Sequence, residues 1–251
     1  MNRMYSGTLS GMLCLVLLSA FNSGPSEVIK EKESRSVGLE KTVSNTAAQG
    51  WRPLFNGKDL TGWKHVGKGS MSVEDGLIRG HGGMGLLYYT GEKFSNCTIR
   101  VVYKMQKENS NSGVFIRIPI EPREEWMPVF YGYEVQIDNN PEASNEDDTH
   151  ATGCLYSMTK ALSRPGKPGP QWNTMEITLD GLRTIVTVNG VKVTDYKEGD
   201  PVPERKFDFE PFRGPRPLAG FIGLQNHGED DVVYFKEVSV KPLAGNKAKG
   251  R

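Results

Sequence analysis

Long apolar runs are missing from this sequence, and so is an excess of charge of either sign. The clearest apolar stretch covers residues 12–18, well short of the roughly 20 residues that a membrane span needs. The 31 Lys and Arg residues almost balance the 30 Asp and Glu residues. We therefore expect no nucleic-acid partner, and no transmembrane span once a signal peptide is removed.

Several chemical signatures are missing as well. The sequence has no nucleophile elbow, phosphate-binding loop or dinucleotide fingerprint, which argues against classical acyl transfer and nucleotide chemistry. Its three cysteines lack the close spacing of a zinc site. Of the four histidines, His150 follows two acidic residues, Asp147 and Asp148, but this spacing matches no strong metal motif. No cofactor is indicated, and a divalent metal ion is left open.

The N-terminus has the pattern of a secretory signal peptide. Arg3 precedes the apolar stretch, and the small residues Ser19 and Ala20 follow it. We expect a signal peptide over 1–23, a flexible polar linker over 24–50, a folded domain over 51–243 and a disordered tail over 244–251; a retained anchor is the alternative. The protein would then be exported to the periplasm or outside a bacterial cell. There Cys97 and Cys154 could pair or stay as buried free thiols.

Helical periodicity is missing from every window of a dozen residues, whereas 29 Gly and 15 Pro residues provide many turns. Polar and apolar residues alternate instead, most clearly over 97–105, as in half-buried antiparallel strands. Asp75-Gly76, Asp180-Gly181 and Asn189-Gly190 are typical of tight hairpin turns. Further strands are expected over 86–90, 113–118, 133–137, 153–157, 172–179, 182–188, 191–196, 219–225 and 232–240. Such short strands bury their apolar faces by stacking, so we predict an all-β, two-sheet antiparallel β-sandwich of jelly-roll type.

Four long connections separate these strands, over residues 119–132, 138–152, 159–171 and 197–218. Long loops in a compact domain are usually functional or disordered. Trp126 and His150 lie on two of them, and we count both among the candidate substrate-binding residues.

The strand expected over 133–137 carries the strongest signal for a site. Because alternate residues of a strand share a face, Glu134, Gln136 and Asp138 would point one way while Val135 and Ile137 enter the core. Carboxylates and amides bind sugar hydroxyls, and aromatic rings such as that of Tyr133 pack on sugar rings. A sugar-binding surface is therefore indicated, although the same pattern fits a solvated outer face.

Two other segments contribute candidates. Arg117 is either a surface charge or a fixed donor that faces Glu134 or an oxyanion. Gln225 and His227 are two residues apart and could project together from the end of a strand.

In their order along the chain, the motifs resemble those of the 3-keto-disaccharide hydrolase domain family. The resemblance covers residues 51 to about 243 and is carried by Trp51–Trp63, Asn111–Arg117, Tyr133–Asp138, Gly153–Tyr156, Trp172-Asn173, Asn189-Gly190 and Gly223–Gly228. It implies a concanavalin A-like, lectin-like sandwich in an exported bacterial protein, with activity on 3-keto-glycosides. Tyr156, within one of these motifs, joins the expected substrate-binding residues. Lys236 and Cys154 depart from the family pattern at positions that affect packing.

Ordinary glycosidases need two carboxyls about 5 to 9.5 Å apart. Glu134 and Asp138 are four strand residues apart, roughly 13 Å between Cα atoms, so this pair gives weak support for direct hydrolysis. A 3-keto sugar is easier to cleave, because its carbonyl acidifies the C2 proton and the C1 substituent can then be eliminated. Glu134 or His227 would be the base, and Arg117, Gln136 or a bound cation would polarise the C3 oxygen, with hydration completing net hydrolysis.

Two alternatives stay open at this point. A non-catalytic carbohydrate-binding module would use the same sandwich and the same polar strand face without turnover. A structural or complex-forming surface domain would leave that face in solvent.

Overall fold

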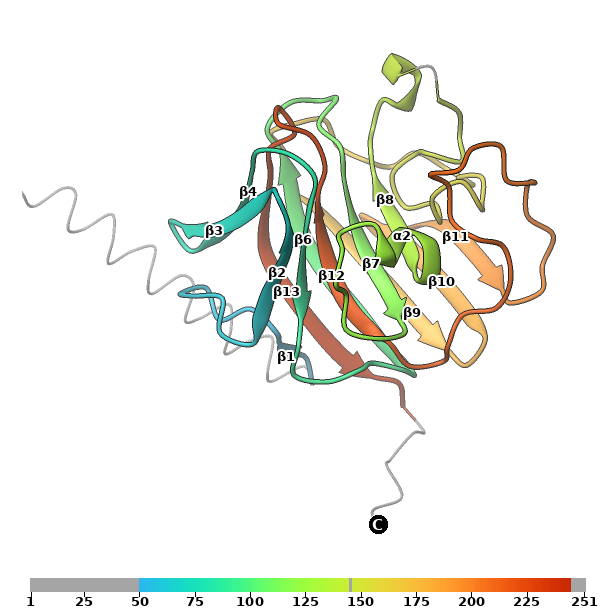
Figure 1. Ribbon diagram of the computed structural model, residues 1–251, viewed down its shortest axis with the longest axis horizontal. Helices are drawn as coiled ribbons and strands as arrows, with labels where there is room; N and C mark the ends of the chain where they lie inside the picture. The colour runs from blue at the N-terminus through green and yellow to red at the C-terminus, as the bar shows by residue number, and fades with distance from the viewer. Residues whose placement is uncertain (1–49, 145, 245–251) are drawn as a thin grey trace, which may run out of the picture. The chain divides into compact units, whose positions relative to one another are not determined.

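Two antiparallel sheets form the computed structural model (Figure 1), which describes residues 50–144 and 146–244. The apolar faces of the strands are buried between these sheets. The expected signal peptide, all but the last residue of the expected linker and residues 245–251 of the expected tail lie outside the described residues. The predicted two-sheet antiparallel β-sandwich is confirmed. None of the helices in these two ranges is long and apolar enough to cross a membrane.

The larger sheet has eight strands in the order β11-β10-β9-β6-β13-β4-β3, with β1 paired to β13. Their bounds are Arg52–Pro53 (β1), Ser70–Glu74 (β3), Leu77–His81 (β4), Cys97–Met105 (β6), Asn173–Asp180 (β9), Arg183–Val188 (β10), Val191–Lys197 (β11) and Val233–Pro242 (β13). The predicted strand over 97–105 is thus β6. The three predicted hairpin turns join β3 to β4, β9 to β10 and β10 to β11. Asp75 and Gly76 adopt φ values of 51° and 76°, as a tight primed turn requires.

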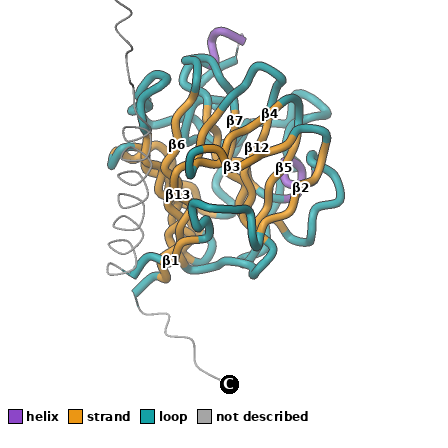
Figure 2. Tube along the Cα trace, turned by 90° about the vertical axis from the view of Figure 1, so that its left-hand side faces the viewer, coloured by secondary structure: helices purple, strands orange, loops and turns teal. Residues whose placement is uncertain are grey.

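The smaller sheet has five strands in the order β2-β5-β12-β7-β8. They are Trp63–Gly67 (β2), Gly85–Tyr89 (β5), Ser112–Ile118 (β7), Tyr133–Ile137 (β8) and Phe221–Asn226 (β12). Helix α2, Met127–Tyr131, contacts β7 and β8, and a 3-10 turn, η1, covers Pro141–Ser144. Figure 2 shows that strands and loops dominate and that both helical segments are short.

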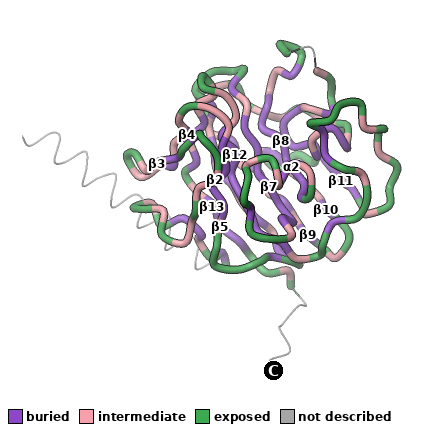
Figure 3. Tube along the Cα trace, in the orientation of Figure 1, coloured by how far each residue is buried: buried purple, intermediate pink, exposed green. Residues whose placement is uncertain are grey.

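The smaller sheet is buried on both faces. Its inner face joins the main core through residues such as Leu87, Val114 and Val135. On its outer face, Leu86, Tyr88, Phe115, Ile118 and Phe221 form a second apolar cluster with Val129 of α2. Figure 3 shows β7 and β12 as buried along most of their length. Loops and α2 therefore cover a face that a simple sandwich would expose to water.

The structure corrects one predicted strand and decides the state of the two cysteines. The strand expected over 153–157 is a series of turns with a single bridge, between Leu155 and Val135. Positive φ values at Gly153 (89°) and Ser157 (57°) bend the chain at both ends of this segment, which prevents an extended strand. Cys97 and Cys154 are buried free thiols, one of the two states that the sequence left open.

Candidate functional site

A cavity of about 160 Å³ lies over the outer face of the smaller sheet. Glu134 and Gln136 reach it from β8 and Gln225 from β12, while the covering loops supply residues from distant parts of the sequence. The complete lining is Met84, Asn111, Trp126, Val129, Glu134, Gln136, Glu146, Tyr156, Phe209, Gln225 and His227. Six of the ten predicted site residues therefore meet in one place.

Strand alternation and one glycine place the Glu134 carboxyl. Tyr133, Val135 and Ile137 fill the inner core, so Glu134 points to the outer face. There it lies over β7 in the space beside Gly113. A Cβ at Gly113 would be 2.4 Å from Oε1 of Glu134, which is closer than any nonbonded contact allows. Glycine at this position is thus a steric requirement for the observed carboxyl position.

Glu134 is only 5% exposed. Burial raises the pKa of its carboxyl to about 8, although the charge of His227 and a hydrogen bond with Gln225 act in the opposite direction. The effect is expected, because removing a carboxylate from water penalises its charged form. At neutral pH Glu134 is mainly a carboxylic acid that can donate a proton.

His227 and Asp231 form a hydrogen-bonded pair at the cavity wall. The distance from Nδ1 of His227 to Oδ2 of Asp231 is 2.8 Å. Burial by itself lowers the pKa of His227, but the hydrogen bond and charge of Asp231, with the charges of Glu134 and Glu146, raise it overall. Asp231 thus holds the proton on Nδ1 and leaves Nε2 as the nitrogen that can accept one.

Asp231 is itself held in place by the backbone. It accepts hydrogen bonds from the N–H groups of Asn111, at 2.8 Å, and Gly228, at 3.0 Å. Burial raises the pKa of Asp231, but these bonds and His227 lower it overall. The carboxylate therefore stays ionised and orients the imidazole.

Two buried amide oxygens in the cavity have no hydrogen-bond partner among the residues that the structure describes. They are Oε1 of Gln136 and Oε1 of Gln225, and the two side chains are 2% and 4% exposed. An unsatisfied buried acceptor is costly unless a ligand or water supplies a donor. The hydroxyl groups of a sugar are suitable donors, so the cavity has the polarity of a carbohydrate site.

Trp126 and Tyr156 complete the predicted residues that line this cavity. Burial, and then the charge of Glu134, raise the pKa of the Tyr156 hydroxyl, which keeps it a neutral O–H donor. The Tyr156 ring lies edge-on to the His150 ring, with 5.0 Å between centroids. His150 itself lines a neighbouring cavity.

Arg117 is a fixed donor and not a surface charge, but it does not face Glu134. The register of β7 against β12 shifts at a bulge here, and Arg117 has a φ of 54°. An extra residue reverses the alternation of side chains beyond it, so Arg117 leaves the face that carries Phe115. Its guanidinium is 1% exposed and donates to the carbonyl oxygens of Gly181, Pro217 and Leu218. These contacts fix the end of the loop over 197–218.

Tyr133 also lies away from the cavity, because it shares the inner face of β8 with Val135. Its ring is 1% exposed and packs edge-on against Tyr196 at 5.9 Å, while its hydroxyl donates to Glu198. Tyr133 is therefore a core residue in this structure, and contact with a sugar would require it to leave the core.

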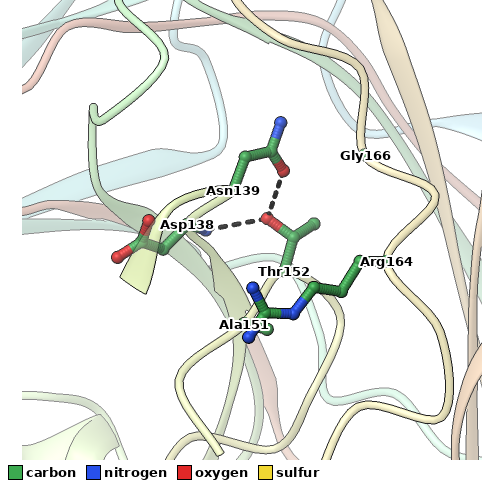
Figure 4. A pocket seen from close by; sticks show the side chains of 6 residues that line it. All are labelled: Asp138, Asn139, Ala151, Thr152, Arg164 and Gly166. Atoms are coloured by element: carbon green, nitrogen blue, oxygen red, sulfur yellow. Dashed lines mark hydrogen bonds between the residues drawn. The ribbon is translucent and has the colours of Figure 1, made fainter. Parts of the chain in front are cut away.

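Asp138 lines a separate cavity of only about 30 Å³ (Figure 4). Its backbone N–H donates to the Thr152 hydroxyl at 2.8 Å, and that hydroxyl donates to Asn139 at 2.7 Å. Burial raises the pKa of the Asp138 carboxyl to about 6. Figure 4 shows this carboxyl turned away from Arg164. Asp138 and Glu134 thus do not line one cavity.

Sequence reasoning missed several residues of the site. Asn111 is part of a quoted motif but drew no role, and Asp231 follows His227 by four residues without a recognisable pattern. Glu146 and Phe209 lie in long loops, where nothing in the local sequence indicates that they approach β8. In the two ranges that the structure describes, no group of three or more His, Cys, Asp and Glu residues is arranged to hold a metal ion.

Comparisons with known proteins point to one family. A family model described as a 3-keto-alpha-glucoside-1,2-lyase-like domain matches residues 50–241. A curated relative from Bacteroides thetaiotaomicron, named 3-keto-disaccharide hydrolase, is 27% identical over 253 residues. The match covers 84% of this chain and 85% of the relative.

Solved structures give the same result at the level of the fold. Two proteins from Parabacteroides distasonis named as glycosyl hydrolases are 28% and 25% identical, with TM-scores of 0.65 and 0.61. The first match covers 79% of this chain and 96% of the other; the second covers 77% and 99%. A Bacillus subtilis protein with a galectin-like fold is 10% identical with a TM-score of 0.54, covering 76% and 94%. This last likeness concerns the fold alone.

Proposed function

The chain belongs to the 3-keto-alpha-glucoside-1,2-lyase-like domain family, and from this premise we propose that it cleaves 3-keto-glucosides by eliminating the substituent at C1. One observation carries the proposal. A buried carboxylic acid, Glu134, and an aspartate-oriented imidazole, His227, line the same small cavity. An elimination needs one base and one acid, and two groups whose environments differ in this way can supply them.

The ketone makes this chemistry accessible. A carbonyl at C3 acidifies the proton on C2, because the resulting negative charge spreads onto the C3 oxygen. The Tyr156 hydroxyl and the Gln136 amide N–H groups are the donors in the cavity that would hydrogen bond to that oxygen. Fixed donors aimed at a developing oxyanion lower the barrier substantially.

His227 acts as the base and Glu134 as the acid in the first step. Nε2 of His227 takes the C2 proton, and the electron pair of the C2–H bond forms the enolate. That pair then becomes the C1=C2 double bond as the bond from C1 to the glycosidic oxygen breaks. Glu134 gives its proton to the departing oxygen, which leaves as an alcohol.

Hydration reverses the two roles. The Glu134 carboxylate takes a proton from water as the water oxygen bonds to C1, and protonated His227 returns a proton to C2. Both side chains are then in their starting states, and the balance of the two steps is hydrolysis. The same two groups account for lyase activity if the unsaturated sugar is released before water adds.

The experiment that tests the function compares substrates that differ only in oxidation at C3. Purified protein is incubated with a methyl 3-keto-glucoside and with methyl glucoside, in parallel with and without a chelator and added divalent metal salts. We expect cleavage of the keto compound alone, with an unsaturated or a free 3-keto sugar as product. Binding of both sugars without turnover under every metal condition would identify a carbohydrate-binding module instead.

Export is part of the proposal and rests on the sequence pattern of residues 1–23. The periplasm or the cell exterior would then be the place of action. Mass spectrometry of the protein recovered from fractionated bacterial cells would show a shortened N-terminus in an exported fraction. Recovery of the full-length chain from the cytoplasm would contradict this part.

A further inference from the structure

We propose that a second cavity beside the first one is the subsite for the leaving group, and that it takes a neutral sugar unit. This inference rests on the proposed function and adds that the oxidised sugar unit occupies the first cavity while the departing unit occupies the second. The second cavity has a volume of about 440 Å³ and is lined mainly by residues of the loops over 138–152 and 197–218.

The two cavities adjoin one another. Glu146 and Phe209 line both of them. Tyr156 on the wall of the first and His150 on the wall of the second are in ring contact, 5.0 Å between centroids. A substrate held at Glu134 would therefore have its C1 substituent within reach of the second cavity.

Size supports an extended substrate. The first cavity, about 160 Å³, is smaller than the roughly 300 to 1,000 Å³ that ligand pockets usually have. The second, about 440 Å³, is within that range. A disaccharide would use both, with the oxidised unit beside Glu134 and the departing unit beyond Phe209.

The lining of the second cavity has the character of a sugar site. Phe207 and Phe209 stack at 5.1 Å between centroids, with planes 7° apart, and they are 56% and 50% exposed. Exposed aromatic surface of this kind packs against the C–H face of a pyranose ring. Thr149, Ser157 and His150 supply hydrogen-bonding groups nearby.

Charge favours a neutral leaving unit. Four carboxylate residues line the cavity, namely Glu146, Asp147, Glu204 and Glu210, against two lysines, Lys160 and Lys206. The carboxylate of Glu210 is paired with Arg213 at 3.2 Å. The remaining excess of negative charge would repel a phosphate or a uronate.

The test measures kcat/KM for two substrates that share the oxidised unit. One is a neutral 3-keto-disaccharide, and the other is methyl 3-keto-glucoside, whose methyl group cannot fill the second cavity. Phe207→Ala removes an aromatic ring that lines only the second cavity. Leu162→Ala is the matched control, because Leu162 is 67% exposed and lines neither cavity.

We expect Phe207→Ala to lower kcat/KM for the disaccharide about fivefold or more and to leave the methyl substrate within about twofold. An equal change for both substrates, or no change for either, overturns the assignment. A 3-keto-disaccharide that leaves a uronate should react more slowly than the neutral one. If it reacts equally fast or faster, the neutral class is wrong.

Failure of the proposed function gives a different result. If no 3-keto substrate is cleaved, calorimetric titration with a neutral, unoxidised disaccharide still tests the second cavity. Weaker binding to Phe207→Ala than to the wild-type protein and the Leu162→Ala control supports a sugar subsite. Equal binding by all three, or no binding by the wild-type protein, rejects it.

Discussion

Each sheet has one face turned away from the main core, and these two outer faces are very different. On the eight-stranded sheet, polar side chains form cross-strand pairs at the surface, such as Arg100 with Glu176 at 2.8 Å and Arg183 with Asp195 at 2.7 Å. Buried and partly exposed residues alternate strictly along β6. On the five-stranded sheet, every residue of β7, β8 and β12 is buried, because loops and α2 cover the outer face.

The pKa values of two carboxyls, one on each outer face, show the chemical effect of this difference in burial. Hydrogen bonds from Arg183 and Lys192 lower the pKa of Asp195 to about 2, whereas burial raises the pKa of Glu134 to about 8. Both residues lie on strands and both point away from the main core. The surroundings of a carboxyl therefore decide whether it is a permanent charge or a proton donor.

The largest effect is expected when the acid is removed from the covered face. Glu134→Gln keeps the size of the side chain but cannot donate a proton to the glycosidic oxygen, so kcat should fall about 10² to 10⁴-fold. The control is Glu176→Gln on the outer face of the larger sheet, which should keep activity within about twofold. Steady-state assays with methyl 3-keto-glucoside measure both. Comparable losses in the two variants would contradict the role of Glu134.

The second prediction concerns how the free energy of unfolding changes with pH, which should differ between a carboxyl on the covered face and one on the exposed face. The folded-state pKa of Glu134, about 8, lies above its ordinary value of 4.5, so its stabilising contribution is complete below pH 4.5 and is lost as pH rises through about 8. Wild-type protein should lose on the order of 4 kcal/mol relative to Glu134→Gln over that window. Urea unfolding at pH 5 and pH 9, followed by tryptophan fluorescence, measures the difference.

Asp195→Asn is the control for this experiment. The pKa of Asp195 is depressed, so its contribution is present above about pH 4 and is lost as pH falls towards 2. At this surface pair the effect should stay below about 1 kcal/mol. Equal alkaline profiles for wild-type protein and Glu134→Gln would show that Glu134 is already ionised near neutral pH.

A third change displaces the carboxyl without altering it. In Gly113→Ala the new Cβ would occupy the position of the Glu134 carboxyl, and misplacement by about 1 Å can cost about 10²-fold in rate. Gly223→Ala is a matched control in the same sheet, since its Cβ would instead meet a methyl group of Leu86 at 2.6 Å. Activity and thermal unfolding are measured for both. Similar activity in the two variants would argue against a precise position for Glu134.

The smallest effect on activity is expected from changing Asp231, which acts only by orienting His227. Asp231→Asn removes the charge that raises the pKa of His227, so the acidic limb of the rate profile should move to lower pH. Loss of this one charge-assisted hydrogen bond, which orients the imidazole, should lower kcat about tenfold. Asp230→Asn, one residue earlier, is the control. An unchanged pH profile in Asp231→Asn would remove His227 from the role of base.

Local sequence patterns predicted much of this molecule. Alternation identified β6 and β8, and with β8 it put Glu134 and Gln136 on the same face. The same rule implied that Tyr133 faces the core, yet its aromatic character led us to count it as a sugar contact. The direction of the Arg117 side chain could not be predicted, because it depends on a bulge in β7. At this bulge Arg117 adopts a φ of 54°, and no glycine or turn residue in the sequence indicates it. The strand predicted over 153–157 was wrong for a similar reason, because the positive φ values at Gly153 and Ser157 turn the chain there.

The order of polar and apolar residues determined the strands, their hairpins and which side chains share a face, because these depend on neighbours one or two positions away. Only the tertiary structure decided which outer face is covered. The loops over 119–132, 138–152 and 197–218 reach the Glu134 cavity from three different parts of the chain, and they keep most water away from Glu134, which is 5% exposed. Whether a carboxyl holds its proton depends on that water, so its chemistry is a property of the assembled sandwich.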